Sequence, residues 1–380
     1  MNNEQYFSIS SNALLLAFIL LLIAIVPFGF ATKSRHTVSW KSALALTWIA
    51  FILQIIYFVC RWKAVGHAPV SNMYEFMTFF GIMLIGAVLL ISYLYKQWSI
   101  GFFALPIALI VLGYGSVFTN KAAPLIPSLQ SNWLAVHVIT VAASSAVLSV
   151  AFVTGLMYLL KTATTKTRST KWLELVLFNL IVVVGFILIS TLCHLFFSPQ
   201  TVEFINKGGQ TTVATYTLPI IISNDTEVGI IKLTTSINAK KLNTIVWSFL
   251  VGIVLYLIIR YTTRKTLCEI LKPFTLRMDL RLLDEISHRA ILIGFPLFSL
   301  GGLFFAMIWA QIAWGRYWGW DPKEVWALIT WLFYAALLHL RLTKEWEGER
   351  TAWLAIIGFG LIVFNQVFVN LVIAGLHSYA

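Results

Sequence analysis

The strongest constraint on this sequence is the recurrence of apolar runs about 20 residues long, the length that an α-helix needs to cross a bilayer. A backbone within lipid must satisfy its own hydrogen bonds, and a helix does so within one segment. The sequence therefore predicts an all-α polytopic membrane protein with about ten transmembrane helices. The expected spans are at about residues 9–31, 40–60, 75–95, 99–118, 133–160, 173–197, 244–260, 290–312, 323–342 and 351–375.

The composition agrees with lipid as the main surroundings of the chain. Only 11% of its 380 residues are charged, and a soluble globular domain carries about a quarter. The net charge of +12 could indicate nucleic acid, but basic residues on cytoplasmic loops also set membrane orientation. We therefore expect contact with membrane lipid and no nucleic-acid partner. The three cysteines lie far apart without CxxC spacing, so neither a thiol redox site nor a zinc site is indicated.

The distribution of lysine and arginine predicts how the spans are oriented. One set of alternating loops holds 18 of the 27 basic residues and the other set holds nine. The richer set should be cytoplasmic. We therefore expect a multi-pass protein of the plasma membrane, or of a thylakoid-type membrane. Both termini and the loop that joins spans 290–312 and 323–342 should lie on the extracytoplasmic side.

Two polar segments interrupt the apolar pattern. Residues 198–243 are rich in Thr, Val and Ile, which predicts a small extracytoplasmic lobe of short β-strands. Residues 261–289 mix acids and bases closely, which predicts an amphipathic helix at the cytoplasmic interface. The expected parts are an N-terminal transmembrane bundle (1–172), an inserted helical hairpin with the outer lobe (173–260), the interfacial segment (261–289) and a C-terminal region (290–380).

The C-terminal region contains an unusual stretch, residues 314–326, which we call the Trp-rich segment. It holds four tryptophans, a tyrosine, two glycines and four charged residues. Tryptophan gathers at bilayer interfaces, which would explain one or two of these rings. A whole loop of rings instead indicates a platform for a large flat ligand at the membrane surface. Asp321 fits a helix N-cap, and Pro322 suits the first turn that follows it.

Two histidines are expected near the same outer face as the Trp-rich segment. His137 lies about one turn inside span 133–160, and His377 lies at the outer end of the last span. Two neutral imidazoles can bind a haem iron from opposite sides. A histidine at a helix end can equally be an interfacial residue, so the residues alone leave both interpretations open.

A third histidine is expected at the opposite depth of the membrane. His339 follows Asp321 by 18 residues, which is about 27 Å of helix. Trp331, Ala335 and His339 share one helical stripe. This stripe is either a second ligand site or a plain packing face, since small residues also permit close helix contact. Of the other histidines, His67 suits a structural role in a loop, and His194 is a weak ligand candidate.

The Trp-rich segment resembles the "WWD" signature of haem-handling proteins. The sequence that follows it, through helix 323–342, is similar to the CcsA/ResC branch of the system II cytochrome c maturation machinery. The Trp133-Leu134-x-x-His137 motif and residues 71–75 and 294–297 resemble the same branch. The resemblance covers most of spans two to five and eight to ten. It says little about residues 173–260, because compact members of the family lack this insertion.

The resemblance implies a function and a set of site residues. The protein would carry haem b, as substrate and ligand, across the membrane and present it to the CxxCH motif of an apocytochrome c. A separate CcsB/ResB-type membrane subunit would complete the complex, and synthase activity is expected only in that complex. His137, His377 and His339 would bind the haem iron. The other candidate haem contacts are Trp314, Arg316, Trp318, Trp320, Asp321, Lys323 and Trp331; Arg316 and Lys323 are candidates for the haem propionates.

Two further functions remain open at this point. The protein could export haem while another protein attaches it, which two depths of histidine would also allow. It could instead be a membrane electron-transfer cytochrome with bis-histidine haems. Such cytochromes usually place facing ligand pairs within helices of one bundle, whereas the pair expected here lies at helix ends beside a loop.

Overall fold

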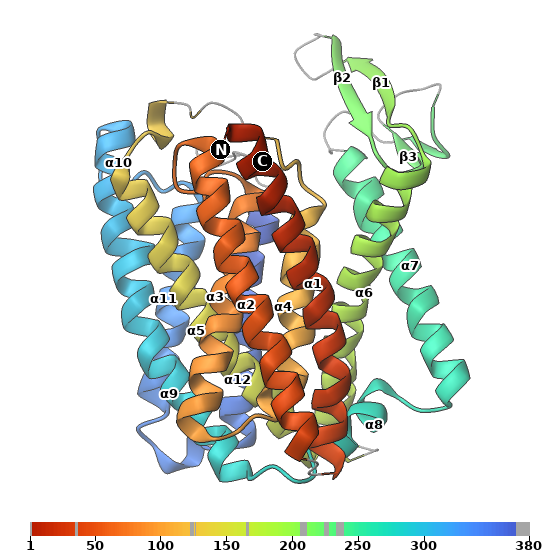
Figure 1. Cartoon of the computed structure of the whole chain (residues 1–380), viewed down its shortest axis with the longest axis vertical. Coiled ribbons are helices and arrows are strands. Elements are labelled where there is room, and N and C mark those ends of the chain that lie inside the picture. The colour runs from red at the N-terminus through yellow and green to blue at the C-terminus, as the bar shows by residue number, and fades with distance from the viewer. Residues whose placement is uncertain are drawn as a thin grey trace. The chain divides into compact units, whose positions relative to one another are not determined.

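The computed structural model describes residues 2–34, 37–121, 125, 127–164, 167–205, 211–223, 228–232 and 239–369. Its main helices, shown in Figure 1, are α1 (Asn3–Ser34), α2 (Thr37–Val65), α3 (Met73–Tyr95), α4 (Ile100–Ser116), α5 (Asn132–Thr162), α6 (Arg168–Phe196), α7 (Ala239–Thr263), α9 (Leu280–Phe298), α10 (Ala306–Trp314), α11 (Pro322–Leu340) and α12 (Glu349–Val363). Shorter elements are α8 (Leu267–Leu271), the 3-10 turns η1 (Pro127–Leu129), η2 (Lys272–Phe274) and η4 (Lys344–Trp346), and the π-helical segments η3 (Ser299–Phe305) and η5 (Phe364–Val369).

The helices confirm an all-α polytopic membrane fold. Within the described residues, eight helical stretches are long and apolar enough to cross a membrane. The other two expected ranges are also helical, as the shorter apolar helix α4 and as α11, but neither helix is among these eight stretches. One stretch is continuous from Leu280 to Trp314, because η3 joins α9 to α10 without a break. This span starts ten residues before the expected range 290–312.

The chain divides into two compact units by its contacts. One unit contains residues 1–163 and 271–380, and the other contains residues 164–270. The second unit encloses the expected insertion 173–260. Helices α6 and α7, green in Figure 1, belong to it.

Helix α5 is the central packing element of the larger unit. It contacts α3, α4, α9, η3, α10 and α12. Two glycines seven residues apart allow its close approach to the α9–η3 span. A Cβ atom on Gly294 would lie 2.6 Å from the Leu148 side chain, and one on Gly301 would lie 2.8 Å from the Val141 backbone nitrogen. Small residues at such positions let two helix backbones meet within a membrane.

A buried ion pair fixes the loop that precedes α3. The Arg61 guanidinium donates to the Glu75 carboxylate at 3.0 Å, and each side chain is 1% exposed. Glu75 also accepts hydrogen bonds from the backbone N–H and hydroxyl of Ser71, while the Asn72 side chain caps α3. A buried charge is costly unless it is paired and fully hydrogen-bonded. The Ser-Asn-Met-Tyr-Glu motif at residues 71–75 therefore holds this loop in one conformation.

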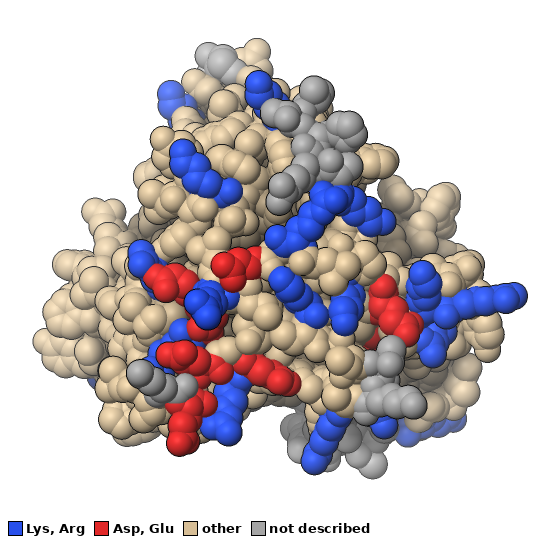
Figure 2. Space-filling view, turned by 90° about the horizontal axis from the view of Figure 1, so that it is seen from below, with Lys and Arg blue, Asp and Glu red and all other residues tan. Residues whose placement is uncertain are grey.

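A second polar cluster joins three elements at the opposite end of the larger unit. Asp284 of α9 pairs with Arg341, which follows α11. The same carboxylate accepts hydrogen bonds from the Thr351 hydroxyl and the Gly348 backbone N–H at the start of α12. Figure 2 views the lower end of Figure 1, where Lys and Arg side chains spread across the face beside a group of acidic ones.

The unit formed by residues 164–270 pairs two helices and a small β lobe. Strand β1 (Gln200–Ile205) pairs antiparallel with β2 (Thr211–Tyr216), and β3 (Ile222–Ser223) pairs parallel with β4 (Ile231–Lys232). The Asn243 side chain in α7 accepts from the N–H groups of Ile221 and Ile222 and donates to the Pro219 carbonyl. This buried amide fastens the lobe to the end of its supporting helix.

At the other end of this unit, Glu174 of α6 organises a short helix. Its carboxylate accepts hydrogen bonds from the backbone N–H groups of Leu267 and Cys268 at 2.8 and 2.9 Å, which caps the start of α8. Burial raises the pKa of the Cys268 thiol, and the neighbouring Glu174 carboxylate raises it further. This cysteine is therefore protonated at neutral pH.

The structure does not form the single amphipathic helix expected over residues 261–289. Helix α7 ends at Thr263, Arg264 adopts a left-handed conformation with φ of 55°, and α8 and η2 follow as short pieces. Pro273 cannot continue a helical hydrogen-bond ladder. The Asp279 side chain then accepts from the Arg281 N–H and caps α9. The last ten residues of the expected helix therefore belong to the next span.

Candidate functional site

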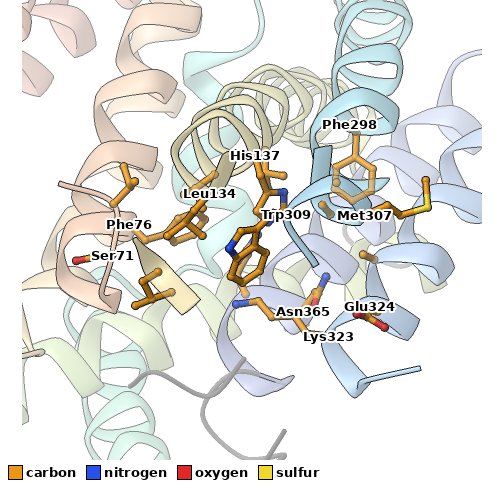
Figure 3. Close-up of a pocket in the computed structure, with 18 of the residues that line it drawn as sticks. Ser71, Phe76, Leu134, His137, Phe298, Met307, Trp309, Lys323, Glu324 and Asn365 are labelled. Carbon is orange, nitrogen blue, oxygen red and sulfur yellow. The ribbon is translucent and has the colours of Figure 1, made fainter. Parts of the chain in front are cut away.

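A cavity in the larger unit brings together the ends of several helices beside the Trp-rich segment (Figure 3). Its walls come from the loop before α3, the first turns of α5, the η3–α10 region, the start of α11 and η5. The space within the lining measures about 1100 Å³, including the part open to solvent.

His137 projects into this cavity from the second turn of α5. The helix begins after Ser131, whose side chain accepts from the Trp133 N–H, so His137 lies near the start of the helix as expected. The ring Nδ1 atom lies 2.8 Å from the Gly301 carbonyl oxygen. A carbonyl oxygen can only accept a hydrogen bond, so Nδ1 carries a proton, and in the neutral ring Nε2 then carries the lone pair. This is the arrangement of a metal-ligating histidine, in which a backbone carbonyl sets the tautomer and the ring orientation.

Gly301 makes this hydrogen bond possible by two features of its position. It lies in the π-helical segment η3, and such segments occur frequently at functional sites. It also lacks a Cβ atom, which would otherwise lie 2.8 Å from the Val141 backbone nitrogen and 2.9 Å from Thr140 Cβ. The bare backbone therefore lets α5 approach closely enough for the His137 ring to reach the carbonyl. Gly301 is not among the residues predicted from the sequence.

A buried indole supports the histidine ring. Trp309 of α10 is 2% exposed and lies nearly parallel to His137, with 5.8 Å between ring centroids and 10° between ring planes. Trp314 packs against Trp309 at 4.8 Å. Trp309 is not among the predicted site residues, because it falls inside an expected span, where a tryptophan is not unusual. Trp314, a predicted haem contact, lies behind Trp309 and is absent from the cavity lining.

The Trp-rich segment is shaped by backbone hydrogen bonds. Helix α10 ends at Trp314, and the next residue, Gly315, has a left-handed φ of 70° that stops the helix. Asp321 and Glu324 form a capping box at the start of α11, as the sequence predicted for Asp321. The Glu324 carboxylate accepts from the backbone N–H groups of Gly319 and Asp321 at 2.7 and 3.2 Å. Both acidic side chains therefore hold the conformation of the segment.

The remaining predicted residues of the segment fall into two groups. Trp318 and Lys323 line the cavity. Trp320 is 70% exposed and meets Trp318 edge to face at 6.1 Å. Arg316 lies against Gly319, where a Cβ atom would come within 2.7 Å of the guanidinium. Trp320 and Arg316 are therefore near the cavity without lining it.

His377 lies outside the described residues, so its pairing with His137 stays a prediction. The last described element, η5, ends at Val369.

His339 lies near the end of α11 that is farther from the cavity. It is exposed, on one helical stripe with Ile329, Leu332 and Ala336. Trp331 is anchored instead: its indole N–H donates to the Ser299 hydroxyl at 2.8 Å and its ring packs on Phe295. The structure thus separates the outward-facing histidine from the indole that the sequence placed on the same stripe.

Two carboxamides in η5 also line the cavity, and neither is among the predicted site residues. Asn365 is 7% exposed, and its Oδ1 atom has no hydrogen-bond partner among the described residues. Gln366 lines the cavity beside it. The sequence does contain a signal for Asn365 and Gln366, because adjacent polar residues within an apolar span are energetically costly in lipid and are usually functional.

Comparison with known proteins matches the geometry to a family. The family model described as cytochrome c assembly protein matches residues 70–377. This range contains the described residues that line the cavity.

Curated relatives cover nearly the whole chain. The chain is 31% identical to the cytochrome c biogenesis protein CcsA of Pyropia yezoensis, over 89% of this chain and 87% of the relative. It is 30% identical to the CcsA protein of Guillardia theta, over 100% and 99% of the two chains. It is 29% identical to that of Prochlorococcus marinus strain MIT 9301, over 99% and 96%. The chain therefore belongs to the cytochrome c assembly protein family, as a CcsA-type member with a role in cytochrome c biogenesis.

Proposed function

We propose that the cavity beside the Trp-rich segment holds haem b and presents it for covalent attachment to the CxxCH motif of an apocytochrome c. The observation that carries this proposal is the environment of His137. Its Nδ1–H is held by the Gly301 carbonyl, and its ring enters a cavity walled by aromatic and apolar side chains. A neutral imidazole with a fixed tautomer is a good ligand for haem iron.

The described side chains supply complementary contacts for a porphyrin. Trp318 offers an apolar aromatic face, and Trp309 fixes the plane of the His137 ring. Lys323 provides a cation in the cavity wall, which suits a haem propionate. His377 is proposed as the second iron ligand, on the strength of its place at the end of the last span.

The chemistry at this site depends mainly on positioning. In thioether formation, each cysteine S–H adds across a vinyl double bond, so that sulfur bonds to one carbon and hydrogen to the other. The protein has to hold the vinyl groups beside the two thiols in one geometry, which is an effect of proximity and orientation. The rigid surroundings of His137 supply that kind of constraint. We propose that attachment requires a CcsB/ResB-type membrane subunit.

His339 supports the proposed transport of haem across the membrane. It is exposed near the end of α11 that is farther from the cavity. An ionisable side chain on the surface of a transmembrane helix is costly in lipid, so a partner or ligand is expected to cover it. We propose that the CcsB/ResB-type subunit completes a haem-receiving site there.

The first prediction tests the ligand role of His137. The variant His137→Ala is expected to lose most of the haem that co-purifies with the cavity, because the iron loses a ligand. The measurement is haem content and absorption spectrum of the purified protein, with its partner subunit present. His67→Ala is the matched control, since the His67 ring also bonds a backbone carbonyl but does not line the cavity. Equal haem content and identical spectra in the two variants would refute the assignment.

A second candidate function is haem export without attachment. His137 lies in the cavity, whereas His339 is exposed near the far end of α11. This separation favours haem export, because a transport route needs a haem-binding site at each end. Co-expression with the partner and an apocytochrome c, in a host that lacks other synthases, discriminates the two. Covalent holocytochrome supports attachment, and haem delivery without thioether bonds supports export alone.

A further inference from the structure

The Arg61–Glu75 ion pair lies beside the cavity, and stability alone does not explain it. The guanidinium is 3.0 Å from the carboxylate, and each side chain is 1% exposed. A buried ion pair returns little net stability, because removing two charges from water costs about as much as their attraction gains. Ionisable side chains within membrane spans usually have a function. The contacts of this pair indicate which function that is.

Arg61 of α2 connects several neighbouring elements. Its guanidinium donates to the Asn120 backbone carbonyl, in the segment after α4, at 2.8 Å. It also lies over the Phe7 ring of α1 and the Tyr74 ring of α3, at 5.0 and 5.2 Å from the ring centroids. A cation over an aromatic face is attracted to it, so these rings add to the restraint. The position of the guanidinium is thus fixed from several sides, and with it the position of the Glu75 carboxylate.

Glu75 extends this fixed arrangement to the cavity wall. Its Oε2 atom accepts hydrogen bonds from the Ser71 hydroxyl at 2.8 Å and from the Ser71 backbone N–H at 3.1 Å. Residues 70–73 all line the cavity, and Figure 3 labels Ser71 on this wall. Arg61 therefore determines, through Glu75, where this part of the wall lies.

The same loop packs against the helix that carries His137. Val70 is 6% exposed and belongs to a buried cluster with Phe79 of α3 and Ala142 of α5. Val138, the residue after His137, packs against this cluster. A shift of the loop would therefore move the turn of α5 from which His137 enters the cavity.

We propose that Arg61 and Glu75 are positioning residues for haem binding. The ion pair fixes the loop at residues 70–71, and the loop fixes the turn of α5 that carries His137. Neither charged side chain lines the cavity, so both act through the loop. The inference rests on the proposed function, because it concerns how the same ligand is held.

The test compares two uncharged isosteres, Glu75→Gln and Asp284→Asn. Each removes the carboxylate of an ion pair that also accepts hydrogen bonds from a backbone N–H and a hydroxyl. Asp284 lies at the opposite end of the larger unit, which makes it the matched control. Both substitutions should lower thermal stability, whereas only Glu75→Gln should change haem binding.

Haem binding is measured by titrating haem b into the purified protein with its partner subunit, and counting only the binding that His137→Ala removes. Glu75→Gln should weaken this binding by about tenfold, the lower end of the loss for contacts that orient a metal ligand. The electron paramagnetic resonance signals of the ferric haem, which respond to the orientation of an axial imidazole, should broaden. Wild-type affinity and signals in folded Glu75→Gln would show that the inference is wrong. So would an equal loss in Asp284→Asn, because general destabilisation would then explain both.

A second variant covers the case in which Glu75→Gln does not fold. Glu75→Asp keeps the charge beside Arg61, but its carboxylate is one methylene shorter, so the loop at Ser71 must move or lose a hydrogen bond. Haem affinity should fall, by less than in an uncharged variant, and the haem signals should shift. Wild-type affinity and signals in the folded Asp variant also reject the inference.

The same titrations separate this inference from the proposed function. Haem binding that depends on His137 but is unchanged in the Glu75 variants rejects only the positioning role. Absence of His137-dependent haem binding in the wild-type protein rejects the proposed function, and the inference with it.

Discussion

At the scale of single residues, the site depends on one imidazole and the groups that orient it. The His137 ring is held on one side by the Gly301 carbonyl and supported by the nearly parallel Trp309 indole. Each contact restricts the orientation of the ring. The ring therefore enters the cavity in a single orientation, which reduces the cost of ordering it on binding.

Substitution of Gly301 tests this orientation. Gly301→Ala adds a methyl group that would lie 2.8 Å from the Val141 backbone nitrogen, so α5 and η3 must move apart. The hydrogen bond to His137 should lengthen, and loss of such an orienting contact typically lowers metal affinity by about 10–100-fold. Haem titration of the purified variant measures the effect.

Gly360→Ala is the control for this prediction, because nothing lies within 4 Å of the added methyl group. It should bind haem as wild type does. If Gly301→Ala also binds haem as tightly as wild type, the carbonyl does not position the ligand.

At the scale of elements, the start of α11 determines the shape of the Trp-rich segment. Asp321 accepts from the Lys323 N–H, and Glu324 accepts from the Gly319 and Asp321 N–H groups. These bonds satisfy the otherwise unpaired donors of a helix N-terminus. They also fix the backbone between Trp318 and Lys323, both of which line the cavity. The acidic residues of the segment thus act through backbone geometry.

This role predicts a difference between two substitutions of Asp321. Asp321→Asn keeps a good cap and should retain both stability and haem content, whereas Asp321→Ala should lose about 0.5–2 kcal/mol of stability and part of the haem. Thermal unfolding and haem content of the purified proteins provide the comparison.

Asp279→Ala removes the N-cap of α9, which is not part of the cavity lining. It should lower stability while leaving haem content unchanged. If Asp321→Asn loses as much haem as Asp321→Ala, the carboxylate charge of Asp321 contacts the ligand and the cap is not its main role.

At the scale of the whole molecule, orientation in the membrane follows from where charge gathers. The end opposite the cavity carries the Asp284–Arg341 cluster, and basic side chains spread across the face in Figure 2. Basic loops remain cytoplasmic in membrane proteins. We therefore predict that the cavity and the Trp-rich segment face the extracytoplasmic side, where apocytochromes c would receive haem.

Cysteine labelling on intact cells tests this orientation. In a background with the three native cysteines replaced, Tyr317→Cys and Leu342→Cys report on the two ends, since Tyr317 is 62% exposed and Leu342 is 80% exposed. A membrane-impermeant maleimide should label the Tyr317 position in intact cells and the Leu342 position only after permeabilisation. The reverse pattern would place the Trp-rich segment in the cytoplasm.

Much of this architecture could be predicted from the sequence, because it depends on local pattern and on the surrounding lipid. Apolar length marks the spans, and the residues around Asp321 mark the start of α11. His137 could be placed one turn inside its helix by counting from the polar loop before it. The structure of residues 261–289 was harder to predict from the sequence. Pro273 and the N-cap at Asp279 divide this stretch, whose composition alone favours one amphipathic helix.

The sequence by itself determined the helical membrane fold, the Trp-rich segment and the histidine beside it. Only the tertiary structure decided which groups complete the site: Gly301, Trp309 and Asn365. The carbonyl that orients His137 is 164 residues away in the chain, and Asn365 is farther still. Such contacts depend on how helices pack, and a glycine or an asparagine within an apolar run does not show which neighbour it will meet. Local periodicity sets the helices, whereas close approach of their backbones creates the cavity.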